Sequence, residues 1–233
     1  MKNNKKRWLI AQNAEYKHYK VRRFKWESYE NWRGILKKEF HMDFDDFKNK
    51  TILEVGCGKF GLIYFIPDSK IKVGIEPLIH IYSEDIDFNK SSNIDLIRGI
   101  GEYIPFKDSS FDFIIIFNVL DHTMDPKKVM REVKRVCKND GRVIFMMNTF
   151  EIPLILRKIL NFFDKPHPHH FNKKEILNML SELGFSIEFI KFYKLNLNFS
   201  NITLIKMVKL LISVVLRRHK LFILLKNTKE VLK

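Results

Sequence analysis

Three closely spaced glycines interrupt an apolar run early in the chain and constrain what it can fold into. The segment ILEVGCGKFG (52–61) contains Gly56, Gly58 and Gly61, with an acid, Glu54, just before them. Glycine is needed where the backbone turns sharply or approaches a ligand closely. The pattern therefore predicts a strand followed by a loop that holds a ligand, or a tight strand-to-helix turn without one.

An acid at the end of the next apolar run favours the ligand. Glu76 follows Gly56 by twenty residues, and a carboxylate at that strand tip can accept hydrogen bonds from both hydroxyls of a ribose. The two features together predict a nucleoside-containing cofactor. Two classes compete, a dinucleotide such as NAD and the sulfonium cofactor S-adenosylmethionine. Glu54 favours the sulfonium, because a pyrophosphate would be repelled by a nearby carboxylate.

Short apolar runs alternate with helical patterns after Phe40, which is typical of a parallel sheet with helices on both faces. The run FDFIIIF lacks polar alternation, as expected of a strand buried on both sides. A strand, a helix and a final strand are expected after Gly184. The first five predicted strands are Thr51–Val55, Ile71–Ile75, Ile94–Ile97, Phe111–Phe117 and 142–147, and the helical stretches are 61–65, 77–88, 126–137 and 173–183.

Four successive segments resemble the motifs of one enzyme family. They are LEVGCGKFG, VGIEP, GEYIPFKDSSFDFIIIFNVLDHTMDP and REVKRVCKNDGRVIFMMN. Together they are similar to class I S-adenosylmethionine-dependent methyltransferases of the small-molecule type, such as the ubiquinone and menaquinone biosynthesis enzymes. The resemblance implies an α/β, Rossmann-like seven-stranded, mostly parallel sheet with a C-terminal antiparallel strand and helices on both faces. Residues 49–233 would form this domain, and 1–48 a helical lid or cap, or padding for the sheet.

The resemblance also implies positions for the cofactor, S-adenosyl-L-methionine. Gly101 and Glu102 would lie by the adenine, where the family often has an aspartate at the position of Ile100. Asn118 would face the methionine end, and Cys57 is interpreted as a small residue packed beside the cofactor. The complete expected cofactor set is Glu54, Gly56, Cys57, Gly58, Gly61, Glu76, Pro77, Gly101, Glu102 and Asn118.

Four histidines are the candidates for the chemistry. Methyl transfer requires alignment of an acceptor and, for a hydroxyl, removal of its proton. His167, His169 and His170 in HPHHF follow the fifth strand, and His122 follows the fourth. One of them is predicted to be a general base, with locally capped structural imidazoles as the alternative. No metal site is predicted, because no carboxylate or cysteine pattern completes a ligand set.

The net charge and the apolar pattern of the chain indicate which partners it could bind. The formal net charge is +15, which favours an anionic partner. An apolar helix expected at about 201–218 runs into Arg217, Arg218, His219 and Lys220, and would contact an anionic membrane or cover the sheet. Two widely separated cysteines and no secretory signal indicate a cytoplasmic location, with peripheral contact at the inner face of the membrane as a further hypothesis.

The predicted function is methylation, on oxygen, of a small-molecule or lipid-linked acceptor. The HPHHF loop and the LGF strand resemble those of glycan-pathway methyltransferases, which favours a glycan precursor. An RNA methyltransferase and a non-catalytic cofactor-binding protein are the alternatives. The sequence shows no appended RNA-binding module, which disfavours an RNA methyltransferase. The intact glycines and Glu76 disfavour a non-catalytic protein. The oligomeric state is not predicted.

Overall fold

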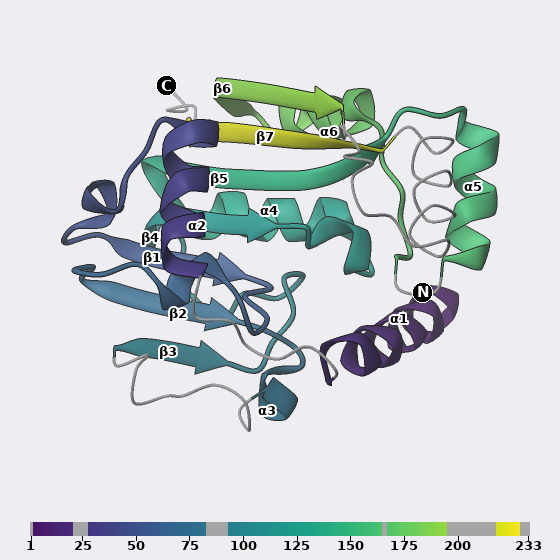
Figure 1. The fold of residues 1–233 in the computed structure, drawn as a ribbon, viewed down its shortest axis with the longest axis horizontal. Helices are drawn as coiled ribbons and strands as arrows, with labels where there is room; N and C mark the ends of the chain where they lie inside the picture. Colours follow the sequence, from purple (N-terminus) through teal and green to yellow (C-terminus); the bar gives the residue numbers. More distant parts are fainter. Residues whose placement is uncertain (1, 21–27, 83–92, 165–166, 195–217, 229–233) are drawn as a thin grey trace, which may run out of the picture.

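The computed structural model describes residues 2–20, 28–82, 93–164, 167–194 and 218–228 (Figure 1). Two N-terminal helices precede an alternation of strands and helices. The helices are α1 (Lys2–Lys20), α2 (Ser28–Ile35), α3 (Ile79–Tyr82), α4 (Pro126–Val136), α5 (Leu154–Phe163) and α6 (Lys173–Glu182), with short turns η1 (Leu36–Phe40), η2 (Phe44–Phe47), η3 (Leu62–Tyr64) and η4 (Leu120–His122). The strands are β1 (Thr51–Val55), β2 (Ile71–Ile75), β3 (Ile94–Ile97), β4 (Phe111–Phe117), β5 (Cys137–Phe150), β6 (Phe185–Lys194) and β7 (Arg218–Asn227).

The described strands form one seven-stranded sheet in the order β3-β2-β1-β4-β5-β7-β6. Neighbours from β3 to β5 pair in parallel, whereas β7 is antiparallel to both β5 and β6. The predicted Rossmann-like, mostly parallel sheet with a C-terminal antiparallel strand is therefore confirmed. The first four strands have the predicted bounds, and β5 is longer than predicted.

Both faces of the sheet are covered, which explains the unbroken apolar run in β4. Ile114 and Ile116 face a core shared with α4 and α6. Phe113 and Ile115 face the opposite core, which α2 and the turns η1 to η3 complete. Because successive strand residues point to opposite faces, apolar residues are expected on both faces of such a strand, and its one polar residue, Asp112, lies near its start.

The two N-terminal helices lie in different places. Trp32 of α2 stacks on Phe117 of β4 with ring centroids 5.3 Å apart, so α2 packs on the sheet. In contrast, α1 lies beyond the carboxyl ends of the parallel strands, at the same end of the molecule as α5 (Figure 1). The N-terminal segment thus includes a helix on the sheet face and a separate helix at the end where ligands bind in open α/β sheets.

Some helical expectations differ from the structure. The stretch predicted at 61–65 is the single turn η3, because Pro67 follows closely and cannot continue a helix. The helix α5 was not predicted. The apolar helix expected at about 201–218 lies outside the described residues, apart from Arg218, which begins β7.

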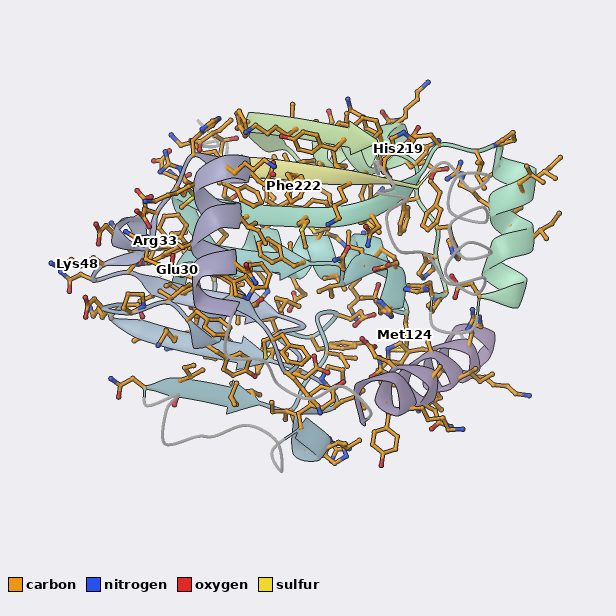
Figure 2. The ribbon with its side chains drawn as sticks, viewed as in Figure 1. Glu30, Arg33, Lys48, Met124, His219 and Phe222 are labelled. Atoms are coloured by element: carbon orange, nitrogen blue, oxygen red, sulfur yellow. The ribbon has the colours of Figure 1, made fainter. Side chains whose placement is uncertain are left out.

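Of the basic residues expected after that helix, Arg218, His219 and Lys220 belong to β7, and Arg217 lies outside the described residues. Figure 2 labels His219, which is buried and stacks on Phe192 with ring centroids 4.8 Å apart. Lys220 is exposed. Within the described part of the chain, no helix has both the length and the apolar character to cross a membrane.

Candidate functional site

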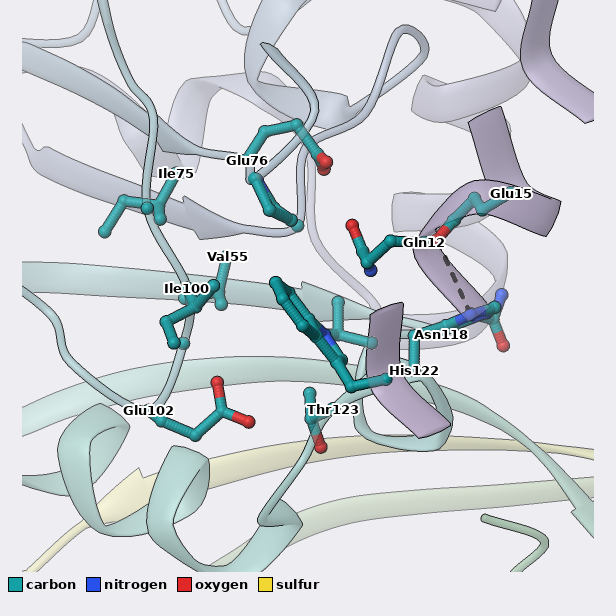
Figure 3. A pocket seen from close by; sticks show the side chains of 16 residues that line it. Gln12, Glu15, Val55, Ile75, Glu76, Ile100, Glu102, Asn118, His122 and Thr123 are labelled. Atoms are coloured by element: carbon teal, nitrogen blue, oxygen red, sulfur yellow. Dashed lines mark ion pairs between the residues drawn. The ribbon is translucent and has the colours of Figure 1, made fainter. Parts of the chain in front are cut away.

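A cavity lies at the carboxyl ends of β1, β2 and β4, where the order of the strands reverses (Figure 3). The loop after β3 and the helix α1 complete its wall, and a second cavity adjoins it along the glycine loop. This is the place at which open α/β sheets bind their ligands. All the residues predicted to bind a cofactor line one or both of these cavities.

The first two glycines are required by backbone conformation and space. Gly56 has φ 70° and Gly58 has φ 51°, in the left-handed region that favours glycine. A Cβ on Gly56 would lie 2.6 Å from Cγ2 of Val119, so a larger residue would displace the next loop. No described atom lies within 4 Å of a Cβ built on Gly58. The loop is therefore open where a ligand would approach its backbone.

The third glycine makes room for the acid that precedes the loop. A Cβ on Gly61 would lie 2.7 Å from Oε2 of Glu54. This carboxylate accepts hydrogen bonds from the backbone N–H groups of Leu62 at 3.2 Å and Ile63 at 2.7 Å. Burial raises the pKa of Glu54 to about 8. Glu54 therefore shapes the loop and also borders the cavity.

Glu76 connects the tip of β2 to the glycine loop. Its Oε2 accepts a hydrogen bond from the backbone of Gly58 at 3.1 Å, and its Oε1 accepts one from Leu78 at 2.9 Å. Burial raises the pKa of Glu76 to about 7. Each carboxylate oxygen has a second lone pair, so Glu76 can also accept hydrogen bonds from two neighbouring hydroxyls in the cavity.

Two other predicted residues border the cavity but use their side chains elsewhere. Oε1 of Glu102 accepts hydrogen bonds from the backbone N–H groups of Met124 and Asp125, at 2.7 and 3.2 Å. Oδ1 of Asn118 accepts bonds from the backbone and side chain of Asn148, at 3.1 and 2.9 Å. These contacts hold the loops around the cavity in place.

The geometry fits a cationic nucleoside cofactor. Glu54 and Glu76 are both buried beside the cavity, and a positive charge between them would favour their ionised forms. Gly101 keeps the opposite wall close, since a Cβ there would lie 2.9 Å from Val129 and 3.0 Å from Val55. The site thus combines an open loop, a carboxylate that can accept hydrogen bonds from ribose hydroxyls, and acidic surroundings.

Cys57 is a buried residue that borders the second cavity. Its side chain is buried, and its Sγ lies 3.6 Å from the hydroxyl of Tyr64. Burial raises the pKa of the Cys57 thiol well above its usual value. A neutral thiol is a poor nucleophile.

The four candidate histidines divide into two pairs. His122 lines both cavities, and its ring lies 4.6 Å from that of His167, centroid to centroid. His169 is directed to the backbone of Thr123, with its Nε2 3.0 Å from the carbonyl oxygen, and burial lowers its pKa. His170 is buried in the loop. The geometry favours His122 and His167 for chemistry.

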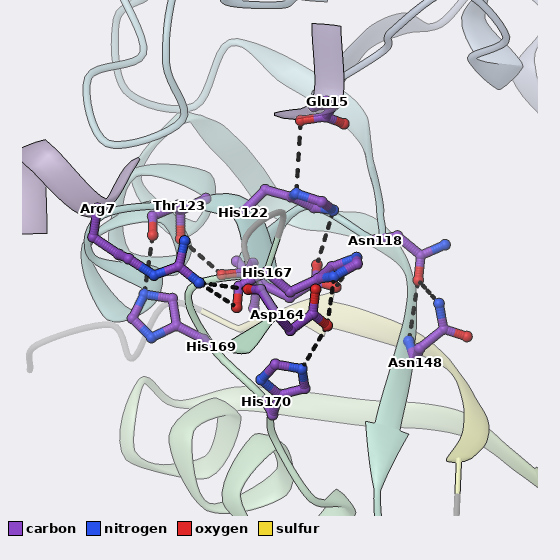
Figure 4. A network of polar contacts seen from close by, with 12 residues as sticks. Arg7, Glu15, Asn118, His122, Thr123, Asn148, Asp164, His167, His169 and His170 are labelled. Atoms are coloured by element: carbon purple, nitrogen blue, oxygen red, sulfur yellow. Dashed lines mark hydrogen bonds and ion pairs between the residues drawn. The ribbon is translucent and has the colours of Figure 1, made fainter. Parts of the chain in front are cut away.

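Several residues of this region were not predicted from the sequence. Asp121 adjoins His122. Asp164 lies between the rings of His167 and His170 (Figure 4). From α1, Glu15 reaches His122, with Oε2 3.6 Å from Nδ1. The LDHT segment placed Asp121 beside a candidate histidine, and the N-terminal segment was expected to form a lid or to pad the sheet, but no sequence signal identified Glu15 as the residue that reaches His122.

Comparisons with known proteins agree with this geometry. Residues 53–145 match the family model of a methyltransferase domain. An uncharacterized protein of Methanocaldococcus jannaschii is 33% identical over 138 residues, 56% of this chain and 61% of that protein. A ubiquinone/menaquinone biosynthesis C-methyltransferase of Pasteurella multocida is 31% identical over 120 residues, 51% of this chain and 41% of that enzyme.

A solved structure shows the same fold. The YcgJ protein of Bacillus subtilis superposes with a TM-score of 0.66 at 16% identity, covering 86% of this chain and 99% of that one. In sequence, the matches cover less than two thirds of the length of these curated relatives.

Proposed function

Because the chain belongs to the class I S-adenosylmethionine-dependent methyltransferases, we propose that it transfers a methyl group from this cofactor to a hydroxyl of a small, lipid-linked acceptor. The observation that carries the proposal is the histidine and carboxylate cluster beside the cofactor cavity. Such a cluster is useful where an acceptor must lose a proton, and a hydroxyl is such an acceptor.

The cofactor, when bound, supplies a methyl group already activated on a positive sulfonium. Glu76 would bind the ribose hydroxyls, and the backbone around Gly58 would lie along the methionine part. The cluster around His122 and His167 would assist the loss of the proton from the acceptor hydroxyl. A carbon–oxygen bond then forms as the carbon–sulfur bond breaks, and the sulfonium becomes a neutral thioether. Alignment of the two reactants contributes the rest of the acceleration.

We further propose that α1 is a lid for this site. Trp8 and Gln12 line the cofactor cavity, and Arg7 donates hydrogen bonds to the backbone carbonyls of Asp164 and His167. Glu15 adds the contact to His122. A helix held at both the cavity and the histidine loop would exclude water during transfer, and it would have to move for the cofactor to enter.

The exposed surface of α5 supports a lipid-linked acceptor. This helix leads directly to Asp164, and it exposes four large apolar side chains. They are Leu154, Ile155, Leu156 and Ile159, exposed by between 48% and 73%. An apolar helix face on a chain of charge +15 is suited to the headgroup region of an anionic membrane. The active site would then face its acceptor at the surface where a lipid carrier resides.

The test is methyl transfer from radiolabelled S-adenosylmethionine to fractions of a cell extract. The fractions are lipid-linked glycans in anionic vesicles, lipid-free glycans and RNA. We expect label in the lipid-linked fraction, and less of it when Ile155→Glu and Ile159→Glu are combined. Label confined to RNA or to lipid-free glycans would contradict the proposed acceptor, and no label in any fraction would contradict the proposed transfer.

A further inference from the structure

Three side chains from two segments converge on one point beside the cavity (Figure 4). Asp121 and His122 come from η4, and His167 comes from the loop after α5. One nitrogen or carboxylate oxygen from each of the three lies within 4.8 Å of the others. Nε2 of His122 is 3.9 Å from Oδ1 of Asp121, and Nε2 of His167 is 4.0 Å from Oδ2.

These separations are too long for hydrogen bonds, but they suit a shared cation. Nitrogen and oxygen ligands lie about 2.0 to 2.2 Å from a zinc ion, so two ligands of one ion lie roughly 3 to 4 Å apart. Asp121 is only 3% exposed, and its Oδ1 accepts no hydrogen bond from the described part of the chain. An ionised carboxylate oxygen that is buried without such bonds is costly, and a cation beside it would offset that cost.

A carboxylate lies behind each of the two imidazoles, and that of Asp164 is within hydrogen-bond distance of His167. Nδ1 of His167 lies 3.0 Å from Oδ2 of Asp164, and Nδ1 of His122 lies 3.6 Å from Oε2 of Glu15. The Asp164 carboxylate beside Nδ1 favours the tautomer of His167 that has its proton on that nitrogen, which leaves the Nε2 lone pair directed at Asp121. Histidines that bind metals commonly have a carboxylate behind them in this way.

We propose that Asp121, His122 and His167 bind one divalent transition-metal ion, preferentially zinc. Two imidazoles and one carboxylate form a three-ligand set that leaves a fourth position open, as in catalytic zinc sites. Because His122 lines the cofactor cavity, the open position adjoins the place of methyl transfer. The sequence did not predict a metal because the ligand set is divided between two distant segments. His167 of HPHH is completed by Asp121 and His122 of the LDHT segment.

Metal binding stands independently of the proposed function, whereas the role of the metal rests on it. An acceptor hydroxyl at the open position would bind through its oxygen and release its proton to water more readily, since a bound metal lowers the pKa of such a group. The resulting oxygen would be the nucleophile. The proposed acceptor is therefore an alcohol or phenol.

The test is a calorimetric titration of the full chain with zinc chloride, after metals have been removed with a chelator. Cobalt chloride followed by visible absorption is a second probe of the ligand geometry. We expect one ion per chain. Asp121→Asn, His122→Gln and His167→Gln should each weaken binding at least about tenfold, and Asp164→Asn by about 10- to 100-fold. His80→Gln, on the exposed face of α3, is the matched control and should bind as the wild type does.

Thermal unfolding gives an independent readout, because an ion that binds the folded chain raises its midpoint. We expect zinc to raise the midpoint of the wild type and of His80→Gln, but not that of Asp121→Asn. The proposal is overturned if the wild type binds neither ion, or if Asp121→Asn binds zinc as tightly as the wild type. Cofactor binding by the same metal-free protein is measured in parallel, so that failure of the metal site is distinguished from failure of the proposed function.

Discussion

His122→Ala and His167→Ala are each expected to lower the turnover number by about a hundredfold or more. Both remove a side chain from the cluster that acts on the acceptor proton, and neither touches the ribose site at Glu76. Affinity for S-adenosylmethionine should therefore change little. Turnover is measured with the lipid-linked fraction as acceptor, and affinity by calorimetry.

The other histidines serve as comparisons for this prediction. His80→Ala, on the exposed face of α3, should leave turnover unchanged. His169→Ala removes a contact with the backbone of Thr123, so it should lower stability more than turnover per folded molecule. If His122→Ala and His167→Ala both turn over as the wild type does, the cluster is structural and the proposed chemistry is wrong.

Gly61→Ala is expected to destabilise the fold by about 1 to 3 kcal/mol, as overpacking of a close-packed region does. The added Cβ would lie 2.6 Å from the carbonyl oxygen of Cys57 and 2.7 Å from Oε2 of Glu54. One contact is with backbone, so the loop itself must move. Chemical unfolding followed by circular dichroism measures the change.

Gly34→Ala is the matched control, because no described atom lies within 4 Å of a Cβ at this position of α2. Alanine is the better helix former, so this variant should be as stable as the wild type or more stable by about 0.5 to 1 kcal/mol. Equal effects of the two substitutions would show that Gly61 is not required by its neighbours.

The sheet and the glycine loop were predictable because local physics dominates there. The strand FDFIIIF must be apolar at each inward position on both faces, and the structure places it at the centre of the sheet between β1 and β5. Likewise, Gly56 and Gly58 have positive φ, a requirement visible in the residue type itself. The family resemblance, the fold and the cofactor class followed from these patterns and are confirmed.

The candidate catalytic cluster was only partly predictable because distant segments build it. His167 meets Asp121 and His122 only after β5 and α5 bring their segments together, and no local pattern encodes that meeting. The side-chain partners of Glu102 and Asn118 were missed for the same reason. The third glycine was interpreted as part of a ligand loop; it lines the second cavity and, in addition, makes room for Glu54, which was not foreseen.

The most direct test of the account is calorimetric titration of the intact protein with S-adenosylmethionine and, separately, with NAD. The titration is done at about pH 8, where Glu76, with a pKa of about 7, is ionised. We expect the wild type to bind one S-adenosylmethionine and no NAD. Glu76→Ala should bind the cofactor about 10- to 100-fold more weakly, because charged hydrogen bonds to the ribose are lost. Binding of NAD without binding of S-adenosylmethionine, or unchanged affinity in Glu76→Ala, would contradict the assignment of this site.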